Sequence, residues 1–264
     1  MKRSRDRVTK FAWYFLGGFL ILLLLAFFWR DYRWDGKKDI RIGMIDDDGL
    51  MVMVISPTRR MINKLIAVKN TPIWVSGGYG YYEAEKVKKL LLQERKENLI
   101  KEIFFYNFGV MVDKIEWNKK EISPDLLGII GYIRFRLSEE NYLNNIEYLM
   151  TSKEDNERIL DEVAVRDLAD SGLLEENIKV NVYNSSDVSG LAGFLGKRLD
   201  WMGLTVIGIN NSIIKEDFFC RIVSGGELKI KFIWNCEKTV DQNLNIDEME
   251  IYFGEKFAKM LQYF

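Results

Sequence analysis

Hydrophobic residues form one long uninterrupted run near the start of the chain. It extends from Phe11 to Trp29, nineteen consecutive residues without a charged side chain. A helix of this length, rising about 1.5 Å per residue, matches the hydrocarbon core of a bilayer. The run also lacks the polar face of an amphipathic core helix. Residues 11–29 therefore predict a single transmembrane helix; a cleaved signal peptide is disfavoured, because bulky Phe27 and Phe28 stand where a processing site needs small residues.

Charged residues before this run predict its orientation. Residues 1–10 carry five basic side chains and one acidic side chain, and basic residues are retained on the cytoplasmic side of a membrane. We therefore expect a cytoplasmic tail at 1–10 and a short polar tether at 30–38. The rest of the chain is expected outside the cytoplasmic membrane. The first expected partner is the membrane lipid bilayer.

The pattern after the tether predicts a mixed α/β domain over residues 39–150. Short apolar runs bounded by turn residues predict strands at 40–45, 50–57 and 64–68. Apolar residues at helical spacing predict an amphipathic helix at 83–99. Residues 100–117 predict a buried strand, a turn and the beginning of a short helix. A further helix is expected to begin at Ser123, which is a suitable N-cap before Pro124.

The remaining sequence predicts a connecting region at 151–177 and a small α/β domain at 178–264. The connecting region is expected to hold a helix at Asp161–Ala169. Two apolar strands flank a helix at 191–203, which is a βαβ pattern and favours a parallel strand pair. A hairpin around 224–227, a strand at 249–254 and a closing helix at 255–264 are expected to follow.

Composition excludes several classes of chemistry. The chain has 264 residues with 38 basic and 39 acidic side chains, so its formal net charge of −1 provides no field to attract nucleic acid. It contains no histidine. Ser-His-Asp catalysis, Cys-His catalysis and histidine-ligated metal sites are therefore excluded.

The two cysteines, Cys220 and Cys236, lie on either side of the predicted hairpin turn. Symmetric pairing about that turn would place Cys220 opposite Lys231 rather than opposite Cys236. A disulfide and two buried free thiols both remain open.

Residues 180–211, VNVYNSSDVSGLAGFLGKRLDWMGLTVIGINN, resemble the opening of the LytR C-terminal domain. The closing MEIYFGEKFAKML is similar to the last strand and helix of that domain. In this segment Asn184, Ser185 and Ser186 can turn the chain and cap the following helix through their side-chain oxygens. The alternative is that this loop binds an anion at the helix N-terminus.

Residues 48–68, DGLMVMVISPTRRMINKLIAV, resemble part of the LytR-CpsA-Psr domain. The resemblance implies a bacterial envelope protein of the family that moves anionic glycopolymers from polyprenyl-pyrophosphate to peptidoglycan. The family holds pyrophosphate with arginines, but Asp46 and Asn70 stand at the matching positions here. Asp48 and Lys69 are therefore only weak catalytic candidates. A metal site at the DDDG turn is not expected.

A glycine- and aromatic-rich loop is the main candidate binding surface. Trp74, Tyr79 and Tyr81 lie around a pair of glycines, and flat aromatic faces beside polar groups can stack on sugar rings or meet a protein partner. The alternative is that these rings pack over the first domain's core.

These observations favour a membrane-anchored, extracytoplasmic cell-envelope protein that is not catalytic. It would bind a wall glycopolymer or another envelope protein, without a cofactor and without nucleic acid. One alternative is an active phosphotransferase of the LytR-CpsA-Psr type, using Mg²⁺ to neutralise the pyrophosphate. The other is a purely structural envelope anchor.

Overall fold

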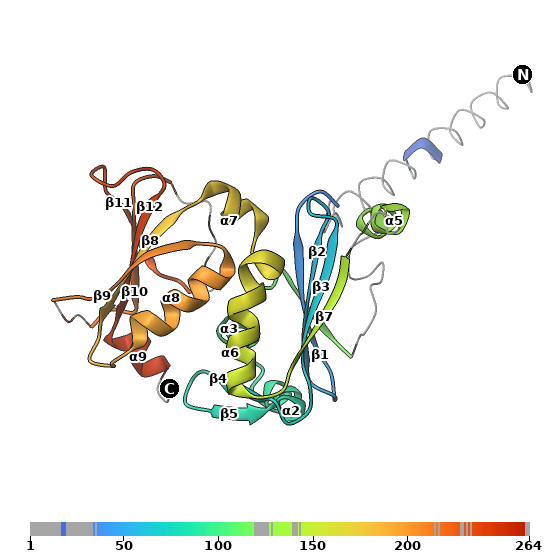
Figure 1. Cartoon of the computed structure of the whole chain (residues 1–264), viewed down its shortest axis with the longest axis horizontal. Helices are drawn as coiled ribbons and strands as arrows, with labels where there is room; N and C mark the ends of the chain where they lie inside the picture. The colour runs from blue at the N-terminus through green and yellow to red at the C-terminus, as the bar shows by residue number, and fades with distance from the viewer. Residues whose placement is uncertain are drawn as a thin grey trace, which may run out of the picture. The chain divides into compact units, whose positions relative to one another are not determined.

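The computed structural model describes residues 17–19, 34, 36–118, 127, 129–138, 142, 144–213, 215, 217–227, 230, 232 and 234–261. The chain divides into two compact units, one formed by residues 1–38 and 121–141 and the other by residues 39–120 and 142–264. In the first unit, residues 17–19 are helical and α5 spans Ile129–Ser138. The other elements labelled in Figure 1 belong to the second unit.

The prediction of a transmembrane helix is corrected by the structure. Within the part of the chain that the structure describes, no helix is long and apolar enough to cross a membrane. Of the predicted span 11–29, residues 17–19 are described and helical; three residues cover about 5 Å, whereas a bilayer core is about 30 Å thick. The other residues of the span, and the predicted tail at 1–10, lie outside the described residues. The fold class is mixed α/β.

The first sheet has five strands in the order β6-β1-β2-β3-β7. Its centre is an antiparallel meander of β1 (Ile40–Ile45), β2 (Leu50–Ser56) and β3 (Met61–Ala67). This confirms the three strands predicted there. Each edge then gains a parallel strand from later in the chain, β6 (Lys114–Trp117) beside β1 and β7 (Asn144–Met150) beside β3. A separate hairpin, β4 (Pro72–Val75) and β5 (Gly80–Glu83), follows β3.

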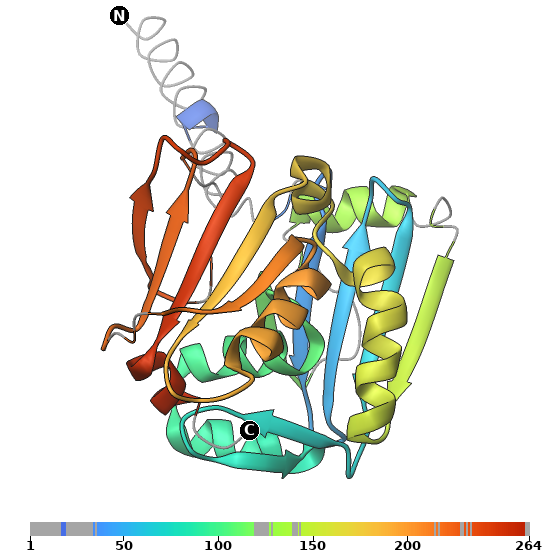
Figure 2. The ribbon, with the colours of Figure 1, turned by 60° about the vertical axis from the view of Figure 1, so that its left-hand side comes forward.

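Helices cover one face of this sheet (Figures 1 and 2). The predicted helix at 83–99 is two helices, α2 (Ala84–Glu94) and α3 (Glu97–Phe108), separated where Arg95 takes a left-handed conformation. The helix expected at 161–169 begins earlier, as α6 (Lys153–Val163), and continues as the π-helical turn η2 (Ala164–Leu168). The short α7 (Ser171–Glu176) leads to the second sheet.

The strand predicted at the beginning of residues 100–117 was wrong, because residues 100–108 belong to α3. This helix packs on two sides. Ile103 and Phe104 belong to the core of the first sheet, whereas Phe105 and Tyr106 belong to the core of the second. Because neighbouring residues 103–106 face two cores, all four are apolar and buried. Four consecutive apolar residues hide the helical period and look like a buried strand. The short helix expected to begin at the end of residues 100–117 is instead strand β6.

Close packing between β1 and α3 gives a testable prediction at Gly43. A Cβ atom placed on this glycine would lie 2.5 Å from Cε2 of Phe104, a fully buried ring. We therefore expect Gly43→Ala to lower the free energy of unfolding by about 1–3 kcal/mol, the usual cost of overpacking a core. Urea denaturation measures this. Gly193→Ala is the control, since no atom lies within 4 Å of its added Cβ, and it should be neutral or stabilising.

The second sheet also has five strands, in the order β11-β10-β12-β8-β9. Strands β8 (Lys179–Ser185) and β9 (Thr205–Asn211) are parallel and are joined by α8 (Leu191–Met202), which confirms the predicted βαβ unit. Strand β12 (Glu248–Gly254) lies beside β8, and α9 (Glu255–Met260) follows it as predicted. The core of this sheet includes the buried Val182, Leu195 and Ile251.

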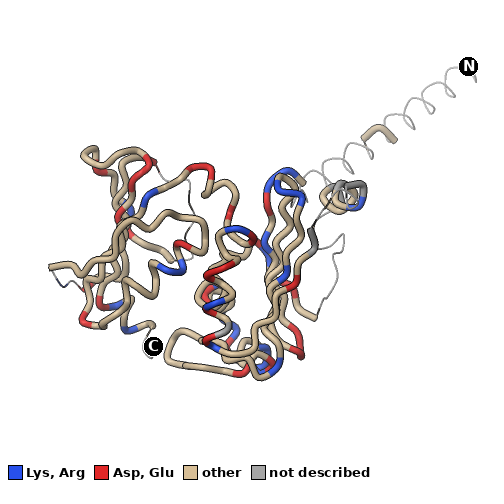
Figure 3. The backbone as a smooth tube through the Cα atoms, in the orientation of Figure 1, with Lys and Arg blue, Asp and Glu red and all other residues tan. Residues whose placement is uncertain are grey.

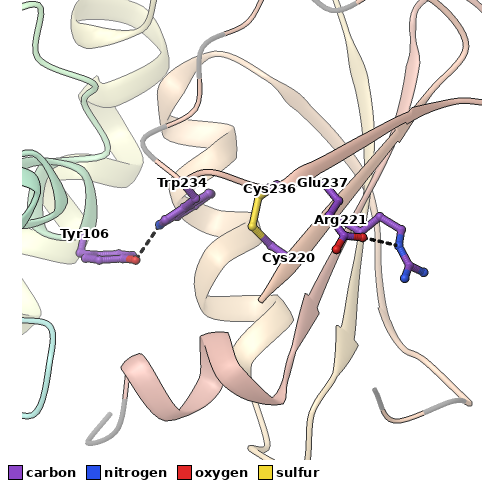
Figure 4. The surroundings of a disulfide bond; sticks show 6 residues. All are labelled: Tyr106, Cys220, Arg221, Trp234, Cys236 and Glu237. Atoms are coloured by element: carbon purple, nitrogen blue, oxygen red, sulfur yellow. Dashed lines mark hydrogen bonds and ion pairs between the residues drawn. A yellow bond between two sulfur atoms is a disulfide. The ribbon is translucent and has the colours of Figure 1, made fainter. Parts of the chain in front are cut away.

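The hairpin predicted around 224–227 was wrong. Strand β10 (Cys220–Ser224) pairs antiparallel with β12 and parallel with β11 (Glu237–Val240). The parallel register sets Arg221 beside Glu237, which brings the preceding residues Cys220 and Cys236 together. They form a disulfide with a Cα–Cα distance of 4.7 Å (Figure 4). The predicted turn residues do not close a hairpin. The N–H of Gly225 donates instead to the carbonyl of Glu248 on β12.

Candidate functional site

The most promising site is a cavity of about 290 Å³ that we call the aromatic cavity. Its walls come from the β4–β5 hairpin, from α3, from α6, and from α8 with the loop before it, all within the second unit. Its lining combines several aromatic side chains with a small set of polar side chains. The residues used below are Trp74, Tyr81, Tyr106, Asn156, Glu157, Phe194, Arg198 and Trp201.

The hairpin supplies two of the rings through its strand register. Trp74 on β4 pairs directly with Tyr81 on β5, and directly opposed residues in an antiparallel pair project from the same face. Trp74 is nearly fully buried, whereas Tyr81 is 47% exposed. The adjacent pair, Ile73 and Tyr82, packs against the core of the first sheet instead. Because successive side chains of a strand point to opposite faces, the Trp74–Tyr81 pair lines the cavity and the Ile73–Tyr82 pair packs on the core.

Rings from other elements complete the aromatic wall. Trp74 meets Tyr106 of α3 edge to face, with ring centroids 5.0 Å apart, and lies 6.1 Å from Phe194 of α8. At the exposed side, Nζ of Lys153 lies 5.2 Å from the centroid of the Tyr81 ring. Such contacts between cations and ring faces are attractive. The cavity thus combines buried rings with one accessible ring.

Arg198 is the central polar group of the aromatic cavity. Its guanidinium carbon lies 3.8 Å from the centroid of Phe194 and 4.8 Å from that of Trp201, and its Nε donates to the carbonyl of Tyr106 at 3.1 Å. Burial lowers the pKa of Arg198 to about 10, although the nearby charge of Glu157 opposes this. The side chain stays charged at neutral pH, but its charge is incompletely compensated.

A carboxylate, Glu157, and an amide, Asn156, line the cavity with this arginine. The nearest carboxylate oxygen, Oε1 of Glu157, is 3.8 Å from the Arg198 guanidinium, which is longer than a hydrogen bond. Glu157 also forms an ion pair with Lys197 at 3.3 Å. The buried Oδ1 of Asn156 has no hydrogen-bond partner among the residues that the structure describes. An unsatisfied acceptor and an under-compensated guanidinium in one cavity are groups that a polar ligand could satisfy.

The structure separates the three aromatic residues predicted for binding. Trp74 and Tyr81 line the aromatic cavity, whereas Tyr79 lines a different cavity of about 480 Å³. There the Tyr79 hydroxyl lies 3.4 Å from Nζ of Lys96. Tyr79 and Tyr81, two residues apart in the chain, therefore line different cavities.

The predicted polar loop before α8 is a buried turn. Asn184, Ser185 and Ser186 are each at most 2% exposed. The amide of Asn184 donates to the carbonyl of Val188 at 2.8 Å and accepts from the backbone N–H and the hydroxyl of Ser186. These hydrogen bonds lie within the turn and stabilise it, as expected for an Asx turn. Ser189 and Gly190, at the end of this loop, are the part of it that lines the aromatic cavity.

Asp48 and Lys69, the weak catalytic candidates, do come together. Their side chains form an ion pair at 3.0 Å, and each is more than half exposed. They line an apolar pocket of about 630 Å³ in which three carboxylates, Asp46, Asp48 and Glu147, accompany two lysines, Lys64 and Lys69. Within the described residues, no group of three or more metal-ligating side chains is found. Asp46 instead accepts the backbone N–H groups of Asp48 and Gly49 and closes the turn.

Sequence reasoning missed the polar centre of the aromatic cavity. Arg198, Glu157 and Asn156 were not singled out, because their partners are distant in the chain. One local signal was present: Phe194 and Trp201 lie four residues before and three residues after Arg198 on the same helix. Residues at these spacings share a helix face, so an arginine between two aromatic rings could have been recognised there.

Comparisons of the chain with protein-family models, with curated proteins and with solved structures return no match. The resemblance to the LytR-CpsA-Psr and LytR C-terminal domains stays a prediction.

Proposed function

We propose that this is an extracytoplasmic cell-envelope protein that binds one unit of a wall glycopolymer in the aromatic cavity, without catalysing its transfer. The observation that carries this proposal is the arrangement of Trp74 and Tyr81 around the stacked guanidinium of Arg198. A sugar ring has an apolar face that packs on an aromatic ring and hydroxyl groups that both donate and accept hydrogen bonds. The cavity offers matching groups of both kinds.

The size of the cavity supports a single bound unit. Pockets for drug-sized ligands begin at about 300 Å³, so a cavity of about 290 Å³ is at the lower end of this range. A polymer would place one ring inside and continue along the surface. Tyr81, which is 47% exposed, would contact the ligand where it enters.

The disulfide supports an extracytoplasmic location. Cys220 and Cys236 are buried and paired, and such bonds persist in oxidising compartments and are rare in the cytosol. This support is independent of the segment at 11–29.

Charge favours binding over the alternative transferase. A pyrophosphate carries several negative charges and needs guanidinium or ammonium partners. Around the Asp48–Lys69 ion pair, however, carboxylates outnumber lysines. Two arginines of the first sheet region, the buried Arg41 and the partly buried Arg59, are engaged elsewhere: Arg41 pairs with Asp113 and Asp170, and Arg59 pairs with Asp39. The pocket at Asp48 is therefore poorly suited to a diphosphate.

Binding of soluble wall glycan fragments tests the proposal. We expect Tyr81→Ala to weaken binding about three- to tenfold, because a stacked ring contributes about 0.5–1.5 kcal/mol beyond its buried area. Arg198→Gln should weaken it further. Isothermal titration calorimetry measures both affinities.

Tyr79→Ala is the matched control, since this tyrosine belongs to the same loop but lines the other cavity. It should leave the affinity unchanged. Equal losses from the two tyrosine variants, or no saturable binding by the unaltered protein, would count against the aromatic cavity as the glycan site. Cosedimentation with intact envelopes but not with purified glycan would favour the purely structural role.

A further inference from the structure

Tyr106 connects the aromatic cavity to the interior of the second sheet's core. Its ring packs edge to face on Trp74, and its backbone carbonyl accepts the Nε–H of Arg198. Both of those partners line the cavity. On the far side of the ring, the Tyr106 hydroxyl accepts a hydrogen bond of 2.9 Å from Nε1 of Trp234. Tyr106 is only 1% exposed, so this hydroxyl depends on the protein for its partner.

Trp234 is held in place by the disulfide and by rings. It lies two residues before Cys236, which is bonded to Cys220 at the beginning of β10 (Figure 4). Phe105, Phe253 and Phe257 meet its ring edge-on at 5.0, 5.3 and 5.2 Å. Between β10 and β11, the described residues form neither helix nor strand. The disulfide is therefore the nearest cross-link to Trp234. The described residues around Trp234 have no strand pairing that would hold the chain in place.

We propose that Trp234, fixed by the Cys220–Cys236 disulfide, is a positioning residue for the aromatic cavity and acts through the hydroxyl of Tyr106. Three observations converge on this. The hydrogen bond is buried, its acceptor residue also receives Arg198, and the donor residue is anchored by a cross-link that lies outside the cavity lining. Loss of the indole donor leaves a buried hydroxyl unsatisfied, and α3 can shift to relieve it.

The consequence for ligand binding rests on the proposed function, but the consequence for the cavity itself does not. If Trp234 only contributed to stability, its loss would change the unfolding transition and leave the folded cavity as it is. If Trp234 positions Tyr106, its loss changes the cavity in molecules that are still folded. The experiment must therefore observe the native state with and without a ligand.

The first arm measures amide hydrogen exchange in the unliganded, full-length protein. In Trp234→Phe, and in the double variant Cys220→Ser/Cys236→Ser, we expect amides of residues 103–108 to exchange about tenfold faster or more, under conditions where the protein remains folded. Ile222→Val is the matched control. Ile222 is fully buried on β10 beside the disulfide, so this variant weakens the same sheet without touching the Tyr106 bond.

The second arm measures the affinity for soluble wall glycan fragments in a double-mutant cycle. Tyr106→Phe and Trp234→Phe should each weaken binding about three- to tenfold, the usual range for one lost hydrogen bond. Because both remove the same bond, the double variant should be no weaker than the worse single variant. Independent, multiplying losses would overturn the proposed route through the hydroxyl.

The two arms separate the two proposals. If residues 103–108 exchange faster in Trp234→Phe but the unaltered protein does not bind glycan, the positioning role is supported and the proposed function is contradicted. Unchanged exchange at 103–108 in Trp234→Phe, with the control also unchanged, would overturn the positioning role whatever the glycan data show.

Discussion

Replacing Arg41 with methionine is expected to lower the free energy of unfolding by about 3–5 kcal/mol, the range for breaking a buried ion pair by removing one partner. Arg41 on β1 is 8% exposed. Its Nε lies 3.2 Å from Oδ2 of Asp113, and its guanidinium also donates to Asp170, the N-cap residue of α7. Methionine fills similar volume but leaves both carboxylates without their cation. Urea denaturation followed by tryptophan fluorescence measures the loss.

The double variant Arg41→Met/Asp170→Asn is the informative control. It removes one of the two negative charges that Arg41→Met leaves without a cation, so we expect it to regain part of the lost stability. Arg158→Met provides the baseline for an arginine on the surface, because the Arg158–Glu162 ion pair is 64% exposed on both sides and such pairs contribute little. A loss below about 1 kcal/mol for Arg41→Met would contradict the argument.

The same cluster predicts the direction of a pH effect. Burial disfavours the charged form of Asp170, but the charge of Arg41 and its hydrogen bond outweigh this and hold the pKa of Asp170 below its ordinary value of 3.8. A carboxyl group whose pKa is lowered by folding stabilises the protein above its unfolded pKa, and this stabilisation is lost as the pH falls through the folded pKa. The acid-linked loss below about pH 4 should therefore be smaller in Arg41→Met.

Local sequence signals were sufficient to predict the elements that are bounded by clear turn or capping residues. Strands β1 and β2 are apolar apart from Arg41 and the final Ser56, and they are separated by DDDG. Asp46 closes that turn with its own side chain. The βαβ unit was equally legible, since Gly203 ends α8 in a left-handed conformation before β9 begins. In these segments the structure is determined by residues within about ten positions of one another in the chain.

Long-range packing decided the elements that the sequence did not predict. Helix α3 contributes to two cores, so its apolar residues 103–106 are consecutive and hide the helical period. Strand β10 pairs with β11 in parallel, although its turn residues favoured a hairpin. The aromatic cavity shows the same division. Trp74 and Tyr81 could be found because they share one loop, whereas Arg198 reaches them only after the two sheets pack on α3.

Removing the disulfide with Cys220→Ser/Cys236→Ser is expected to lower the free energy of unfolding by about 3 kcal/mol. The cysteines are 16 residues apart, and in the chain-entropy account a cross-link closing a loop of this size restricts the unfolded chain by about that amount. Guanidinium denaturation measures the change.

The origin of this effect makes a second, sharper expectation. A cross-link that acts on the unfolded chain limits how far that chain can expand, so its removal should also increase the denaturant m-value. Core damage alone would lower the midpoint without raising m, and Ile222→Val, buried on the same strand as Cys220, supplies that comparison. Should the serine variant lose stability with an unchanged m-value, the disulfide would be acting through the folded core rather than by restricting the unfolded chain.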